Sequence, residues 1–122
     1  MLNSTSPAVL AFVAAATAAY AVYWERMGLT YAKPPRVVAI EKQKFIFLQV
    51  QEDRGGEYVP GSSYAFIAKE DGETKTLGAV KAGDILKAAT FKAPAKGIRG
   101  NVFSATNGAE AISAWGSGIR YL

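Results

Sequence analysis

The chain has 122 residues, half of them hydrophobic and a fifth charged, with a net charge of +4 at neutral pH. That length allows one small domain plus an appendage, and the composition is that of a folded protein. The chain contains no cysteine and no histidine, which excludes disulfides, thiolate metal sites, a cysteine nucleophile and the commonest general base and zinc ligand. We therefore expect a protein that is not an enzyme, with no catalytic residue, metal site, cofactor or small-molecule substrate.

The first part of the chain is apolar. No side chain from Met1 to Trp24 is charged, and eight of the nineteen residues from Ser6 to Trp24 are alanine. Ser6 followed by Pro7 is typical of a helix start, and Gly28 is a residue at which a helix commonly ends. A helix of about twenty residues is roughly 30 Å long, the thickness of the hydrocarbon layer of a bilayer. The sequence therefore predicts an N-terminal transmembrane helix, with residues 1–28 as a membrane anchor.

Two other interpretations of this segment stay open. A secretion signal would explain the small residues near Ala19 and Ala21, although no basic residue precedes the apolar run. A soluble alanine-rich helix buried among partners is also consistent with the composition, because alanine is the best helix former.

The alanines indicate how the helix would be held. They recur at spacings of three and four, so they line one side of the helix and allow a close approach by another helix in a membrane. Aromatic residues at the far end suit the headgroup region. The residues expected to anchor and pack the helix are Ala8, Ala11, Phe12, Ala15, Ala18, Ala19, Tyr20, Tyr23 and Trp24.

Basic side chains lie on the C-terminal side of the predicted helix. On its N-terminal side the only positive charge is the α-amino group. The basic side chains are Arg26, Lys33, Arg36, Lys42 and Lys44. In a cell membrane this asymmetry predicts a single-pass protein with its N-terminus outside and its folded domain in the cytoplasm. The internal membrane of a virion is a further possible location.

The rest of the chain changes from helical to β patterning. Lys33-Pro34-Pro35 stiffens the backbone, so residues 29–36 are expected to form a rigid spacer ahead of a β domain over residues 37–122. Residues 36–52 alternate as one long bent strand or two short ones.

Local signals suggest the turns and short helices of this domain. Asp71-Gly72 is the strongest hairpin signal, and the segment that begins at Asp84 favours a strand over a short helix. Asn107 with Glu110 has the spacing of a capping box for a short helix. The predicted fold is a single N-terminal transmembrane helix plus a small, mainly antiparallel β barrel or sandwich with one or two short helices.

The second half of the chain carries the excess positive charge. Residues 74–122 have seven basic and two acidic side chains, whereas residues 1–73 have seven basic and eight acidic ones. The segment 81–99 is a candidate surface for anionic lipid or nucleic acid, and an ordinary solvated face or a docking surface for an acidic protein are the alternatives. Its residues are Lys81, Lys87, Lys92, Lys96 and Arg99.

These features favour a structural or assembly role. We expect a membrane-anchored subunit of a large complex, such as a minor membrane protein of a lipid-containing virion or an accessory subunit of a membrane complex. Its partners would be other protein subunits and the lipid bilayer. A membrane-tethered module that uses residues 81–99 for binding is an alternative, and a pilin-like filament subunit is another.

Overall fold

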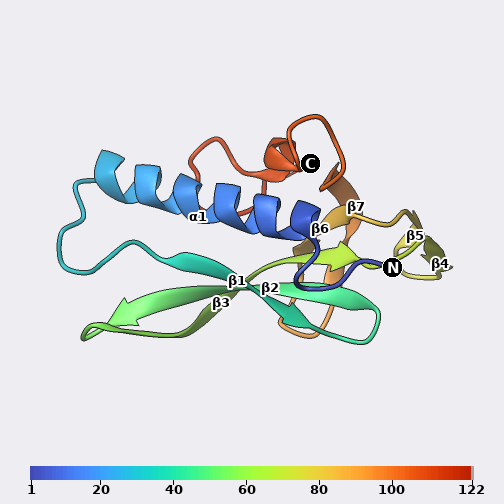
Figure 1. Ribbon diagram of the computed structural model, residues 1–122, viewed down its shortest axis with the longest axis horizontal. Helices are drawn as coiled ribbons and strands as arrows, with labels where there is room; N and C mark the ends of the chain where they lie inside the picture. Colours follow the sequence, from blue (N-terminus) through green and yellow to red (C-terminus); the bar gives the residue numbers. More distant parts are fainter. Residues whose placement is uncertain (122) are drawn as a thin grey trace.

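The protein is one long helix laid along an antiparallel sheet, as Figure 1 shows for the computed structural model, which describes residues 1–121. The main sheet has five strands in the order β1-β2-β3-β6-β7, and β4 pairs with β5 in a separate two-stranded sheet. A short 3₁₀ turn, η1, follows the last strand. The elements are α1 (Pro7–Arg26), β1 (Arg36–Glu41), β2 (Phe45–Arg54), β3 (Glu57–Ala68), β4 (Gly72–Thr74), β5 (Gly78–Val80), β6 (Asp84–Ala88), β7 (Pro94–Asn101) and η1 (Ala109–Ala111).

The predicted fold class, an N-terminal helix and a small, mainly antiparallel β domain, is confirmed. The sheet is open and not closed into a barrel. The apolar run after the spacer forms two strands, β1 and β2, which pair from Arg36↔Gln51 to Glu41↔Ile46. The segment that begins at Asp84 is a strand, β6, which joins β3 to β7.

The prediction of a hairpin turn at Asp71-Gly72 is wrong. Strand β3 pairs with the distant strand β6, and Gly72 begins β4, whose hairpin to β5 turns over residues 75–77. The Asp71 carboxylate instead accepts a hydrogen bond from the Ala82 amide at 2.8 Å. Long-range pairing of β3 thus overrides the local turn preference.

The short helix predicted after Asn107 is present as the 3₁₀ helix Ala109–Ala111, which is only three residues long, but the predicted capping-box start is wrong. Asn107 has a positive φ of 52°, and the turn starts from Gly108. The Glu110 side chain reaches back to accept hydrogen bonds from the Asn101 amide and the Ser104 hydroxyl. This tertiary contact replaces the predicted capping box.

The helix α1 has the predicted start and end. Pro7 is its first residue, and the chain leaves the helix through Gly28, which has a positive φ of 66°. Ser6 stands at the N-cap position, but its hydroxyl makes no capping bond and accepts a hydrogen bond from the Asn3 amide instead.

One side of α1 is part of the hydrophobic core. Val9, Phe12 and Ala16 are fully buried against the sheet. The Val37 amide of β1 donates a hydrogen bond of 3.0 Å to the Thr17 hydroxyl, which ties the middle of the helix to the first strand. The helix and the sheet therefore share a single core.

The N-terminal residues are tied to the sheet as well. The Leu2 amide donates to the Lys69 carbonyl at 3.0 Å, and the Ser4 amide donates to the Glu41 carboxylate at 2.8 Å. Lys69 is buried and forms an ion pair with Glu41. Hydrogen bonding from Lys69 and Ser4 lowers the pKa of Glu41. These contacts fix the start of α1 over one end of β1 and β3.

The segment after β7 covers a second side of α1. Gly108, with a φ of 86°, lies where an added Cβ would be 2.6 Å from Ile85 Cδ1 and 3.0 Å from Phe12 Cδ1. An added Cβ on Gly116 would be 2.7 Å from the Ala19 carbonyl oxygen. Only glycine allows this backbone to approach the helix so closely.

Candidate functional site

The side of α1 that faces away from the sheet remains uncovered. From Leu10 to Val22 its exposed residues recur at spacings of three and four and none is polar or charged, and the exposed Glu25 and Arg26 follow in the last turn of the helix. Leu10 and Val22 are 49% and 54% exposed, and alanines lie between them. We call this the outer face of α1, and it consists of Leu10, Ala11, Ala14, Ala18, Ala21 and Val22.

The structure divides the predicted anchor residues between the two sides of the helix. Phe12 is fully buried, and Ala8 and Tyr20 pack against the core. Ala11 and Ala18 lie on the outer face, while Ala15, Ala19, Tyr23 and Trp24 are half-buried. The predicted alanine stripe is therefore shared between the core and the solvent.

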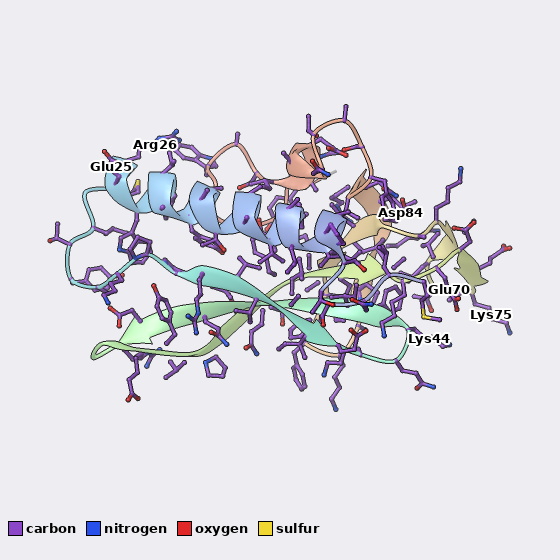
Figure 2. The ribbon with its side chains drawn as sticks, viewed as in Figure 1. Glu25, Arg26, Lys44, Glu70, Lys75 and Asp84 are labelled. Atoms are coloured by element: carbon purple, nitrogen blue, oxygen red, sulfur yellow. The ribbon has the colours of Figure 1, made fainter. Side chains whose placement is uncertain are left out.

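The aromatic end of α1 is held by the spacer. The Trp24 indole N–H donates to the Ala32 carbonyl at 3.0 Å, and its ring centroid lies 5.7 Å from that of Tyr31. Figure 2 shows Glu25 and Arg26 at this end of the helix, away from the sheet. By length and composition, α1 is one helix that could cross a membrane.

The residues of the predicted basic surface 81–99 differ in exposure and in their contacts. Arg99 is buried and donates to the carbonyls of Lys96 and Gly97. Lys87 is half-buried, and its ammonium lies 3.3 Å from the Ile119 carbonyl and 3.5 Å from the centroid of the Tyr121 ring. Lys81, Lys92 and Lys96 are exposed, the first between β5 and β6, the second between β6 and β7, and the third in β7.

A second candidate site lies on the sheet face opposite α1. It is a cleft of about 470 Å³ between the β1–β2 turn and the β6–β7 turn. Its floor contains Phe45 and the buried Phe66, whose ring centroids are 5.9 Å apart at an interplanar angle of 79°. We call it the lysine–phenylalanine cleft, and it is lined by Lys42, Gln43, Lys44, Phe45, Phe66, Phe91 and Lys92.

Both turns that form the cleft are fixed by hydrogen bonds. The Lys42 amide donates to the Phe45 carbonyl at 3.1 Å, which closes the β1–β2 turn. In the β6–β7 turn, the Thr90 hydroxyl accepts hydrogen bonds of 3.1 Å from the amides of Lys92 and Ala93. Phe91 is 64% exposed at the tip of this turn. The ring is therefore presented to solvent by an ordered turn.

Outside these two surfaces, Tyr64 and Glu110 have shifted pKa values. Burial raises the pKa of the Tyr64 hydroxyl, and a smaller contribution comes from Tyr20. Partial burial alone would raise the pKa of Glu110, but hydrogen bonds from Thr106, the Asn101 amide and Ser104 outweigh it and lower the pKa to about 2. Within residues 1–121, no group of three or more carboxylates is placed to hold a metal ion.

Residues 38–122 match the model of a family of unknown function, DUF7717. The chain belongs to this family. The match begins within β1, so it includes every residue that lines the lysine–phenylalanine cleft and leaves α1 outside. No curated protein and no solved structure matches the chain.

Sequence reasoning identified only part of this cleft. Phe91 and Lys92 belong to the predicted basic segment, but Lys42 and Lys44 were assigned to membrane orientation. Phe45 falls within the alternating segment 36–52, and this alternation was the local signal for the side of the sheet on which its ring lies. The pairing of β3 with β6, which brings the two turns together, has no local signature.

Proposed function

We propose that this chain is a non-enzymatic structural subunit of a larger assembly and that the outer face of α1 holds it against a partner protein. A helix that is apolar on all sides is normally buried on all sides. The sheet and the segment after β7 cover only part of α1, and six small or apolar side chains face outward without a charge among them. This uncovered apolar face is the observation that supports the proposal.

The chemistry of the outer face suits another helix. Alanine side chains leave little distance between backbones, so two helices can approach closely and gain dispersion contacts along their length. Leu10 and Val22 stand at opposite ends of the face and offer larger side chains to a partner. The missing histidine and cysteine favour a non-catalytic role.

The double substitution Ala14→Glu with Ala18→Lys tests this function. It places an ion pair at helical spacing in the middle of the outer face and leaves the net charge unchanged. Both alanines are exposed, so we expect the free energy of unfolding to change by less than about 0.5 kcal/mol. The native complex should dissociate, because the two larger charged side chains prevent close approach, and the desolvation cost of burying the ion pair at the interface can exceed the Coulombic gain.

The measurement is the native size of the tagged full chain in gentle-detergent extracts of the cells that make it. The control is Ser62→Glu with Ala105→Lys, which adds the same charges at exposed positions off the helix. The wild type and the control should migrate well above the mass of one chain, and the α1 variant as a monomer. A monomeric wild type, or equal behaviour of the two variants, would overturn the proposal.

A second candidate function is membrane anchoring, which the length and apolar character of α1 favour. In that arrangement α1 would leave the sheet and cross the bilayer once, with the N-terminus outside and the β domain in the cytoplasm. Alkaline carbonate extraction separates the two candidates. A chain held by a protein partner should be released into the soluble fraction, whereas a membrane-spanning chain should stay with the lipid.

A further inference from the structure

The lysine–phenylalanine cleft lies on the side of the sheet opposite α1. In Figure 1 the helix covers one face, and the β6–β7 turn projects beyond the other. A partner protein at the outer face of α1 would therefore leave the cleft accessible. The cleft does not serve the proposed structural function, and its residues require a separate explanation.

The cleft combines positive charge with aromatic surface. Three lysines line it, and none of its described lining residues is acidic. The Lys92 ammonium lies 5.4 Å from the centroid of the Phe91 ring, and the Lys42 ammonium lies 5.7 Å from that of Phe47. The two ion pairs found among residues 1–121 join Arg54 to Glu52 and Lys69 to Glu41, so neither engages a cleft lysine.

The nearest acidic residue in sequence does not neutralise the cleft. Glu41 precedes Lys42 directly, but its carboxylate lies on the helix side of the sheet. There it forms an ion pair with Lys69 and accepts a hydrogen bond from the Ser4 amide. The neighbouring cavity shares Gln43, Lys44 and Phe45 with the cleft and contains carboxylates, among them Glu70. Figure 2 shows Lys44 and Glu70 at the same end of the molecule. Lys42 and Lys92 line the cleft but not this neighbouring cavity, so the cleft keeps an excess of positive charge.

The volume and the lining together limit the class of ligand. About 470 Å³ falls within the usual range for small-ligand sites, roughly 300–1,000 Å³, and is far more than one phosphate requires. An exposed ring such as Phe91 provides a surface for stacking, and the lysine ammonium groups provide donors for an anion. A ligand that satisfies both has a flat ring joined to a phosphate.

We propose that the lysine–phenylalanine cleft binds a nucleotide unit, with the base stacked on Phe91 and the phosphate held by Lys42, Lys44 and Lys92. Proteins that bind single strands without sequence preference use this combination of a basic groove and aromatic rings. The nucleotide is either free or part of a single-stranded nucleic acid. An anionic lipid headgroup has the phosphate but no flat ring for Phe91, so the aromatic part of the cleft favours the nucleotide.

The test uses the full chain and three probes at about 50 mM salt, a concentration at which phosphate contacts are strong. Thymidine monophosphate is titrated calorimetrically, and a labelled fifteen-residue oligothymidylate is followed by fluorescence anisotropy. Vesicles of phosphatidylcholine and phosphatidylserine are the third probe. We expect the chain to bind the oligothymidylate. If thymidine monophosphate also binds, the ligand can be a free nucleotide, and if it does not bind, the ligand is a single-stranded nucleic acid.

Variants then locate the binding site. Phe91→Ala should weaken binding about tenfold or more, through the loss of one base-stacking contact. Lys42→Ala with Lys92→Ala should weaken binding about tenfold and reduce the salt dependence by roughly 1.4 in log–log slope, as two single-strand phosphate contacts require. The matched control is Lys75→Ala with Lys96→Ala, which removes two exposed charges outside the cleft and should change the affinity by less than about twofold.

Three results would overturn the proposal. One is the absence of binding by both nucleotide probes at about millimolar concentration and low salt, where even non-specific nucleic-acid binding is measurable. Another is an equal loss in the control variant, which would indicate general electrostatic attraction by a basic protein. Binding to the vesicles alone would assign the lysines to lipid.

Discussion

The two sides of α1 have similar side chains and opposite surroundings. Val9, Phe12 and Ala16 are fully buried against the sheet, whereas Leu10, Ala14 and other outer-face residues of equal polarity face solvent. Hydrophobicity alone therefore does not decide which side of this helix enters the core. What separates the sides is shape, because the sheet and the backbone at Gly108 and Gly116 fit closely against the inner side.

Phe12→Ala should have the largest effect on stability of the substitutions considered. Phe12 is fully buried between the sheet and the segment after β7, and deleting a buried phenylalanine side chain typically costs about 3–5 kcal/mol. The measurement is urea unfolding followed by tryptophan fluorescence. Leu10→Ala is the matched control on the outer face, where we expect a change within about 0.5 kcal/mol. Equal losses would mean that the two sides are equally packed.

Gly108→Ala should have the next largest effect, about 1–3 kcal/mol, which is typical of overpacking in a core. The new methyl group would lie 2.6 Å from Ile85 Cδ1 and 3.0 Å from Phe12 Cδ1. Gly55→Ala measures the backbone contribution alone, because its φ of 65° is also positive but its added Cβ meets nothing within 4 Å. If urea unfolding gives the same loss of stability for both variants, the close packing of Gly108 against Ile85 and Phe12 does not contribute to the free energy of unfolding.

Local sequence patterns predicted those parts of the fold that depend on neighbouring residues. The bounds of α1 follow from Pro7 and Gly28, and the strands β1, β2 and β6 follow from alternation and β-branched residues. The turn at Asp71-Gly72 failed, because the carboxylate that marks such a turn is used to hold the Ala82 amide. Aspartate is common both in hairpin turns and as an acceptor for backbone amides, so an Asp-Gly pair does not by itself identify a hairpin.

The arrangement of α1 on the sheet could not be predicted for a different reason. In an amphipathic helix the polar residues mark the side that faces solvent, and the opposite side is buried. The helix α1 has no charged residue before Glu25 to mark its outward side in this way. The lysine–phenylalanine cleft was equally hidden, because its two turns are far apart in the sequence and meet only through the pairing of β3 with β6. Sequence patterns therefore indicated which residue types the outer face of α1 and the lysine–phenylalanine cleft contain, but not where in the fold these surfaces lie.

Glu110→Gln should have the smallest effect and should depend on pH. The pKa of Glu110 is lowered from its ordinary value of 4.5 to about 2, so its ionised form stabilises the folded state above pH 4.5, and that contribution disappears as the pH falls toward 2. Because the carboxylate is largely exposed, solvent screening limits the difference at pH 7 to about 1 kcal/mol.

The measurement is the free energy of unfolding at pH 7, 4 and 2.5 for the wild type and for Glu110→Gln. We expect the variant to be less stable at pH 7 and nearly equal to the wild type at the lowest pH. Glu57→Gln, at the exposed start of β3, is the control and should retain the wild-type pH dependence. A constant difference across the range would contradict the assignment. Because Glu110 fixes the turn that places Gly108 on Phe12, a confirmed pH dependence would show that the inner side of α1 depends on this carboxylate for part of its cover.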